Sequence, residues 1–457
     1  MTSVRSQIRP MLALALPLVL AEVGWMFMAV VDTIMVGHLP RPAITISAAA
    51  LAQVIYNTLA FGIGGVLLGL DTYISQSHGA GRVDDANRWL LHGLVLAALL
   101  SALLMAIVAA GPIALRHLPV DHVILDQSIG FLRALNAGTP ALLLYLTLRR
   151  YLQAFNHVRP IAAALVSANL INAVGDWLLL FPHHLAGHRF GGYGVTGAAL
   201  STSIARFYLA GVLLAAIWYV NRKHGYGLRA VFKPLHFERW RLERLALLGA
   251  PVGGQIFVEI SIFAAVTALI GTLGPLPLAG HEIALNCASI TFMVPFAISA
   301  AAAVRVGQAI GRRSSAEAAA AGWTAIALGA GFMLTASAAL LLLPHTIARG
   351  FTGDPAVIAA AVPLLLVAAA FQFFDGLQVT ASGALRGAGN THAGLLVQLV
   401  GYWVLGLPLG LLLGYHFKLG ALGLWLGLCA GLIFAGIALI ATWQQTARSI
   451  ATRPGAS

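Results

Sequence analysis

Carboxylate side chains occur inside long apolar stretches of this sequence, where an ionised group is costly. Between Arg244 and His281, Glu259 is the only ionisable side chain. Five of the 15 acidic residues lie deep in such stretches: Glu22, Asp32, Asp176, Glu259 and Asp375. Because burying a charge at membrane depth costs several kcal/mol or more, such residues usually serve transport, proton transfer or ion binding. These acids are therefore the first candidates for the chemistry of the chain.

Glu259 and Asp375 form a candidate pair in the second half of the chain. Glu259 follows Arg244 by 15 residues, and Asp375 precedes Arg386 by 11 residues. At about 1.5 Å per helical residue, the two carboxylates lie roughly 22 and 16 Å from the same basic edge. Two carboxylates sharing a cavity of low dielectric constant can hold a proton or jointly bind a cation such as Na⁺. The alternative is that each acid only hydrogen-bonds a neighbouring helix.

A second oxygen-rich group is expected in the first half of the chain. Asn172 and Asp176 in "NLINAVGD" are spaced i, i+4 and so share one helical face. Asp32 lies in the first apolar stretch, and the hydroxyl of Thr202 could join them. Such a group suits Na⁺ or a proton with its hydrogen-bond partners. Interhelical hydrogen bonding remains the alternative for the amide and the hydroxyl.

The composition is that of an all-α polytopic membrane protein. Of the 457 residues, 59% are hydrophobic and 9% are charged, and mean hydropathy is +0.87. Soluble domains carry about 25% charged residues. The net charge of +12 does not indicate nucleic-acid binding, because the basic residues lie mostly in short loops. The two cysteines lie in apolar runs and form neither a disulfide framework nor a zinc spacing.

Twelve stretches are long and apolar enough to cross a bilayer as helices. They span 11–36, 44–70, 90–111, 128–148, 160–181, 192–219, 245–272, 279–304, 318–344, 356–381, 393–414 and 420–443. One alternate set of loops carries 20 of the 27 basic residues, which places both termini in the cytoplasm by the positive-inside rule. We expect six-helix lobes at 1–220 and 245–443, a cytoplasmic linker at 221–244 and a cytoplasmic tail at 444–457.

The two halves resemble each other at an offset of 232–234 residues. Gln76 and Gly79 in "SQSHGAGR" match Gln308 and Gly311 in "GQAIGRRS". Six spans in each repeat predict a pseudo-twofold axis along the membrane normal, with substrate bound between the lobes and alternating access. The matching prolines in the first span of each half, Pro17 and Pro251, are candidate hinges, because proline removes a backbone hydrogen bond. A static packing kink is equally compatible with them.

Several motifs resemble multidrug and toxic compound extrusion (MATE) transporters of the NorM-like bacterial branch. They are "VDTIMVGHL" (31–39), "SQSHGAGR" (75–82), "VRVGQAIG" (304–311) and "ASGALRGAGNT" (381–391), in the family's order. The resemblance implies two six-helix lobes in a V-shape. It also implies a multi-pass protein of the bacterial inner membrane, functioning as a monomer without a cofactor. That protein would export drugs, mainly organic cations, in exchange for H⁺ or Na⁺.

The resemblance also assigns residues. It implies cation coupling by Glu259 and Asp375 in the C-terminal lobe. In the N-terminal lobe, it implies the same for the group already described, Asp32, Asn172, Asp176 and Thr202. Candidate substrate contacts are Glu22, Glu282, Asp354 and Phe371. Glu22 and Glu282 stand where the family commonly has glutamine, and Phe371 stands where some Na⁺-coupled members have tyrosine, which leaves H⁺ open.

The sequence fits three other functions less well. No lysine follows a glycine, so a phosphate-binding Gly-Lys-Ser/Thr loop is absent and an ATP-driven pump would need another subunit. A flippase of the same superfamily for lipid-linked or amphipathic substrates is the main alternative, although acids predominate at membrane depth and favour cationic substrates. An intramembrane protease is disfavoured because "AVGD" lacks the first glycine of Gly-x-Gly-Asp. We therefore expect no enzymatic activity.

Overall fold

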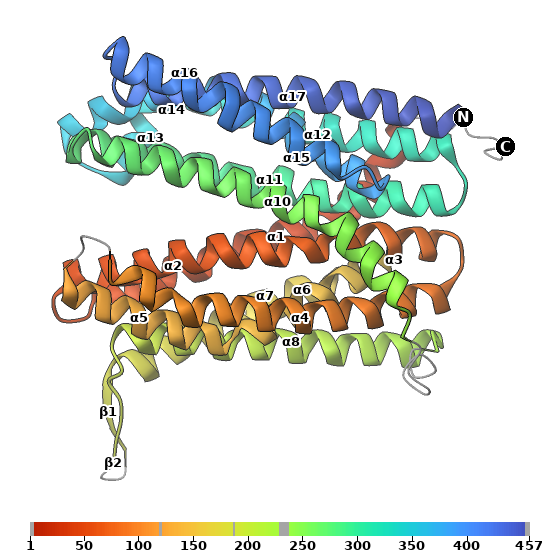
Figure 1. Cartoon of the computed structure of the whole chain (residues 1–457), viewed down its shortest axis with the longest axis horizontal. Helices are drawn as coiled ribbons and strands as arrows, with labels where there is room; N and C mark the ends of the chain where they lie inside the picture. The colour runs from red at the N-terminus through yellow and green to blue at the C-terminus, as the bar shows by residue number, and fades with distance from the viewer. Residues whose placement is uncertain (1–3, 118–120, 186–187, 228–236, 453–457) are drawn as a thin grey trace. The chain divides into compact units, whose positions relative to one another are not determined.

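The computed structural model describes residues 4–117, 121–185, 188–227 and 237–452. In this part of the chain, eleven helices are long and apolar enough to cross a membrane, and a bent helix pair makes a twelfth. The all-α membrane fold expected from the sequence is therefore confirmed (Figure 1). The expected linker at 221–244 and tail at 444–457 lie partly outside the described residues.

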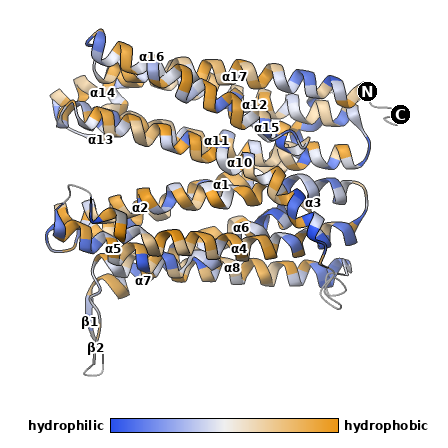
Figure 2. Cartoon of the chain, in the orientation of Figure 1, coloured by the Kyte–Doolittle hydropathy of each residue, from blue (hydrophilic) through white to orange (hydrophobic). Residues whose placement is uncertain are grey.

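Apolar residues dominate the middle of the long helices, and hydrophilic residues gather towards helix ends and loops (Figure 2). In the first half, the elements are α1 (Val4–Gly37), α2 (Pro42–Gly65), η1 (Val66–Leu68), α3 (Gly69–Gly79), α4 (Val83–Leu115), α5 (His122–Ala137), α6 (Thr139–Ala154), α7 (Arg159–Leu180), β1 (Pro182–Leu185), β2 (His188–Gly191) and α8 (Val195–His224). The antiparallel β1–β2 hairpin connects α7 to α8.

The second half has the same succession of long helices. Its elements are α10 (Arg239–Gly271), α11 (Pro275–Gly311), α12 (Ser315–Leu342), α13 (Pro344–Phe351), α14 (Pro355–Gly387), α15 (His392–Gln398), η2 (Leu399–Gly406), α16 (Leu407–Leu411), η3 (Leu412–His416) and α17 (Ala421–Thr452). The η2 and η3 segments are π-helical, so the eleventh span, 392–416, alternates between α and π geometry.

The fourth span is broken, unlike the single helix expected at 128–148. Its two halves, α5 and α6, meet at a bend of 46° at Gly138. Pro140 stands in the first turn of α6, where its missing N–H breaks the helical hydrogen-bond ladder. A side chain at Gly138 would collide with Ser203 of α8, so the bend is packed closely against that helix. Arg206 of α8 donates a hydrogen bond of 3.3 Å to the Leu135 carbonyl beside the break.

The chain forms two compact units, and neither is continuous in sequence. Unit 1 contains residues 1–19, 71–81 and 250–457, and unit 2 contains residues 20–70 and 82–249. Helices α1 and α10 each contribute to both units. In α1 the boundary between the units falls at residues 19–20, within two residues of Pro17. In α10 it falls at residues 249–250, within two residues of Pro251.

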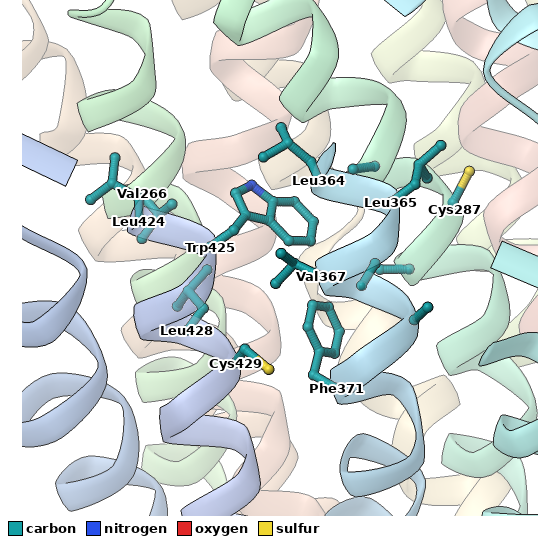
Figure 3. Close-up of a cluster of buried hydrophobic side chains, with 14 of the residues drawn as sticks. Val266, Cys287, Leu364, Leu365, Val367, Phe371, Leu424, Trp425, Leu428 and Cys429 are labelled. Carbon is teal, nitrogen blue, oxygen red and sulfur yellow. The ribbon is translucent and has the colours of Figure 1, made fainter. Parts of the chain in front are cut away.

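The core of unit 1 surrounds Trp425 of α17, which is fully buried. Phe371 of α14 stacks on it with ring centroids 5.7 Å apart (Figure 3). The Trp425 indole N–H donates to His281 Nδ1 at 3.0 Å, and His281 Nε2 lies 2.7 Å from the Thr267 hydroxyl. Because Nδ1 accepts a hydrogen bond, the neutral ring carries its proton on Nε2 and donates it to Thr267. This contact joins α10, α11 and α17.

Glycines allow the last two spans to approach closely. Gly423, Gly427 and Gly431 follow one face of α17 at four-residue spacing. A side chain at Gly427 would overlap the main chain of Gly406 and Gly410 in the eleventh span. Small residues at such spacing are typical of tightly packed membrane helices. One face of the eleventh span is therefore fixed against α17.

Each glycine matched by the internal repeat packs against the main chain of the other repeat in unit 1. A side chain at Gly79 would overlap the main chain of Gln308, and one at Gly311 would overlap the main chain of Gln76. The two contacts are reciprocal, because the glycine of each repeat packs against the matched glutamine of the other repeat. Duplicated segments of α3 and α11 thus cross at backbone distance.

Charged side chains fasten the start of α10 within unit 2. Glu238 accepts hydrogen bonds from Arg88 at 3.1 Å and Arg241 at 2.7 Å. Arg241 also pairs with Asp85 at 2.7 Å, and its guanidinium lies 4.8 Å from the ring centre of Trp89. The hydrogen bond from Arg241 lowers the pKa of Glu238 below its ordinary value, because it stabilises the carboxylate form.

Candidate functional site

The structure brings Glu259 of α10 and Asp375 of α14 into one hydrogen-bonded group. Gln378, one turn after Asp375, donates its amide to both carboxylates, to Glu259 Oε1 and Asp375 Oδ1, at 3.2 Å each. Gln398 of α15 donates to Gln378 Oε1 at 2.7 Å and reaches Glu259 Oε2 at 3.4 Å. Asp375 is buried, whereas Glu259 is partly exposed.

The two carboxylates of this group have no cationic partner within the described residues. Their neighbours, Gln378 and Gln398, are neutral amides, which orient a carboxylate without cancelling its charge. A third amide, Gln255, lies one turn before Glu259 and exchanges hydrogen bonds of 2.8 and 3.2 Å with Ser382. The arrangement therefore keeps two charges available for a proton, a metal cation or a cationic substrate.

The second acid group lies in unit 2 and joins three helices. Asp32 of α1 accepts a 3.0 Å hydrogen bond from the Thr202 hydroxyl of α8. Asp176 of α7 lies beside Asp32. Both aspartates are buried, and both carboxylate oxygens of Asp176 lack a hydrogen-bond partner. This group can accept a proton or a cation without displacing an existing partner.

Asn172 links the group to α8. Its amide donates to the Ser201 hydroxyl at 3.2 Å, and Ser201 donates back to the Asn172 carbonyl at 2.8 Å. The side-chain oxygen Oδ1 of Asn172 has no partner. Asn172 therefore ties two helices together and still has an unpaired side-chain oxygen in the neighbourhood of Asp32.

Arg206, the buried arginine of α8, does not form an ion pair with an acid in the described structure. It donates to the Tyr56 hydroxyl at 2.9 Å and stacks over the Tyr56 ring at 4.8 Å. The Tyr56 hydroxyl also lies 2.8 Å from that of Thr139. The positive charge nevertheless acts on Asp32 through space. The first acid group has no comparable arginine contact.

The expected substrate contacts occupy very different environments. Glu22 is buried and forms an ion pair with Arg149 of α6, one residue beyond the end of the span expected at 128–148. Phe371 is also buried, stacked on the core tryptophan described above. Glu282 is exposed on α11. Asp354 is exposed and caps α14 by accepting the Ala356 N–H at 2.8 Å.

Neither acid group resembles a transition-metal site. Among the described residues, no group of three or more histidine, cysteine, aspartate or glutamate side chains is placed to hold a metal ion. A cation at either group would therefore rely on neutral oxygens in addition to two carboxylates. Hydroxyl and amide oxygens of this kind suit alkali cations and protons.

Several side chains of these groups were missed by sequence reasoning. Gln378, Gln398 and Ser201 contact the acids or their partners, yet isolated glutamine and serine residues in apolar spans carry weak signals. The i, i+3 spacing of Asp375 and Gln378 could have indicated the first of them. No local signal connects Gln398 with Glu259, because 139 residues separate them.

Comparisons with known proteins agree with the repeat and the fold. The MatE family model matches residues 17–178 and 251–412, so the matched segments begin 234 residues apart and confirm the internal duplication. The probable multidrug resistance protein NorM of Mesorhizobium japonicum is 33% identical over 97% of this chain and 95% of its own length. A NorM protein of Geobacillus kaustophilus is 34% identical over 96% and 95%.

Solved transporter structures share the fold at lower identity. The eukaryotic MATE transporter AtDTX14 superposes with a TM-score of 0.85 at 21% identity, over 98% of each chain. An outward-facing multidrug resistance MATE transporter of the MOP superfamily gives a TM-score of 0.87 at 18% identity, over 97% of this chain and 96% of that one.

Proposed function

Because the chain belongs to the MatE family, we propose that it is a secondary active multidrug efflux antiporter. Within the family it is a NorM-like bacterial MATE transporter, and it is not an enzyme. It exports drugs, mainly organic cations, in exchange for H⁺ or Na⁺. The names of its relatives, multidrug resistance proteins NorM, MdtK and PmpM, support the drug substrates. As a MATE transporter, it needs no cofactor.

The observation that carries this proposal is the pair Glu259 and Asp375. Both carboxylates are held by neutral amides, and neither forms an ion pair with a basic side chain among the described residues. A cation bound there is attracted by two negative charges, and the low-dielectric surroundings screen this attraction poorly. A proton, Na⁺ and a cationic drug can therefore compete for the same charges.

Competition for these charges supplies the coupling. When the cation is taken up from the outside, it lowers the affinity for drug, and by linkage the drug lowers the affinity for the cation. Release of drug outside, reorientation, release of the cation into the cytoplasm and renewed drug binding complete the cycle. Hinges at Pro17 and Pro251 would let α1 and α10 bend, since each proline lies inside a long helix and removes a backbone hydrogen bond there.

The group around Asp32 and Asp176 is the rival site for the coupling ion. It also has two carboxylates, together with the Thr202 hydroxyl and the free oxygen of Asn172. The proximity of Arg206 reduces its net negative charge. For this reason, we place the principal cation site at Glu259 and Asp375.

Transport by purified protein in liposomes tests the proposal. The probe is ethidium, a lipophilic cation, and a pH gradient and a Na⁺ gradient are imposed separately. Glu259→Gln and Asp375→Asn are expected to abolish gradient-driven ethidium movement while leaving expression intact. Glu243→Gln is the matched control, because Glu243 lies on the same helix as Glu259 but is exposed and pairs with Arg239 at the surface.

The outcomes separate the two sites. If both C-terminal variants transport as wild type does and Asp32→Asn or Asp176→Asn abolishes transport, the coupling site is the N-terminal group. If wild-type protein moves no ethidium under either gradient, antiport of cationic drugs is refuted.

We further propose a monomer in the bacterial inner membrane with both termini in the cytoplasm. Labelling of a single cysteine introduced near residue 450 in sealed cells tests the orientation.

A further inference from the structure

One face of α6 carries three buried hydrogen-bond donors for which the described residues supply no acceptor. Tyr145, Arg149 and Gln153 follow one another at four-residue spacing, so their side chains share that face. They are 1%, 4% and 0% exposed. The Tyr145 hydroxyl, the Arg149 Nε–H and the Gln153 amide nitrogen have no hydrogen-bond partner. Buried polar groups are nearly always hydrogen-bonded, so three unpaired donors on one face point to a ligand.

Neighbouring side chains fix the orientation of two of these donors. Arg150 donates a hydrogen bond of 3.0 Å to Gln153 Oε1. Because a guanidinium group only donates hydrogen bonds, the amide oxygen of Gln153 must face Arg150, and its NH₂ group is left for another partner. The Tyr145 ring stacks on Trp25 of α1, with ring centroids 6.0 Å apart and ring planes 15° from parallel. The donors are therefore held in place by the fold itself.

The charge around these donors is positive. Arg149 and Arg150, each 4% exposed, both act electrostatically on the Tyr145 hydroxyl. The acid that acts on the same hydroxyl is Glu22, which accepts a hydrogen bond from Nη2 of Arg149. One carboxylate thus faces two guanidinium groups, and the buried surroundings screen the excess positive charge poorly. Water can accept hydrogen bonds from the same donors, but it does not neutralise that charge.

We propose that the Tyr145 hydroxyl, the Arg149 Nε–H and the Gln153 amide bind a small inorganic anion, chloride. A monovalent anion accepts hydrogen bonds from all three donors and balances one positive charge. Because the three side chains are almost entirely buried, the site excludes bulky organic anions and lipid head groups.

Bound chloride would strengthen the junction between α1 and α6. The two helices already meet through the Glu22–Arg149 ion pair and through the stacked rings of Trp25 and Tyr145, and all four residues belong to unit 2. An anion on the same face of α6 removes the repulsion between neighbouring arginines that this ion pair leaves uncompensated. The site is thus separate from the two acid groups, and its existence does not depend on the proposed antiport.

Thermal unfolding of the purified full-length protein in detergent tests the site. Sodium gluconate is replaced stepwise by sodium chloride at fixed pH, so that the Na⁺ concentration and the ionic strength stay constant. A ligand that binds only the folded protein raises stability as its concentration passes the Kd. The apparent melting temperature of wild-type protein should therefore rise along a saturable curve as chloride replaces the bulky gluconate.

Tyr145→Phe is the principal variant, because it removes one hydroxyl and keeps the ring that stacks on Trp25. Hydrogen bonds to an ion are stronger than those between neutral groups, so the chloride midpoint should move at least about tenfold higher. Gln153→Met, of similar length but without the amide, should behave in the same way.

The control is Tyr151→Phe, the same change on the same helix. Tyr151 is also 1% exposed, but its hydroxyl already donates to Asn87 Oδ1 at 2.7 Å. This variant should melt at a lower temperature and keep the wild-type chloride midpoint. Glu22→Gln should shift the midpoint in the opposite direction from Tyr145→Phe, to lower chloride, because it removes the carboxylate that repels the anion and competes for Arg149.

Two results would overturn the proposal. Equal melting temperatures of wild-type protein in chloride and gluconate would refute the site, as would a rise that does not saturate and is shared by every variant, which is a general salt effect. Wild-type chloride midpoints in both Tyr145→Phe and Gln153→Met would refute the assignment of the ligands. If Gln153→Met fails to fold, the comparison of Tyr145→Phe with Tyr151→Phe decides alone.

Discussion

The ion pair between Glu22 and Arg149 gives the sharpest test of how a buried acid is used. The side chains are 9% and 5% exposed, so both charges lie almost entirely away from water. Removing one partner of a buried pair leaves an uncompensated charge and costs about 3–5 kcal/mol, whereas replacing both by apolar residues is often neutral. At about 2 °C per kcal/mol, a single replacement lowers the apparent melting temperature by roughly 6–10 °C.

The assay is a double-mutant cycle measured by thermal unfolding in detergent. Glu22→Leu and Arg149→Met should each destabilise the protein, and the double variant should recover most of the loss. The exposed pair Arg239 and Glu243 supplies the control cycle, using Arg239→Gln and Glu243→Gln. Its coupling should not exceed about 0.5 kcal/mol, because an exposed i, i+4 pair is screened by water.

A role for Glu22 as a substrate contact makes a different prediction. In that case, Glu22→Leu lowers ethidium transport without changing the melting temperature, and Arg149→Met does not restore it. An unchanged melting temperature in both single variants would refute the reasoning from burial. Recovery of stability in the double variant, with or without transport, would establish that Glu22 mainly neutralises Arg149.

Three further predictions concern packing, pH and a buried hydroxyl. Gly311→Ala, whose new methyl group would overlap the backbone opposite, should lose about 1–3 kcal/mol in thermal unfolding, while Gly331→Ala, with open space around it, should not. Glu238 has a lowered pKa, so the melting temperature of wild type should exceed that of Glu238→Gln above pH 4.5, and the difference should vanish as the pH falls further. A constant difference would refute this. Tyr56→Phe removes the acceptor of the buried arginine in α8 and should cost about 1–3 kcal/mol, whereas unchanged unfolding would show that the stacking contact suffices.

Local features of the sequence predicted the number of spans and the position of the acids. Hydropathy over about 20 residues marks a membrane helix wherever it occurs, because the bilayer and not the partner helix imposes that length. All twelve expected spans correspond to helices or to the bent pair, and the duplication was visible at residues such as Gln76 and Gln308. The bend at Gly138 was not predicted, although Pro140 carries a local signal for it.

Which side chains meet was decided by the tertiary structure. Hydropathy gives the depth of a residue but not the rotation of its helix, and rotation determines whether Glu22 faces substrate or Arg149. For the same reason, only the structure shows that Phe371, a candidate substrate contact, is buried against Trp425. Gln398 comes within 3.4 Å of Glu259 although 139 residues separate them in sequence, and the span that carries Gln398 packs its glycines against α17. The sequence thus supplied the charges and their depth, and long-range packing selected their neighbours.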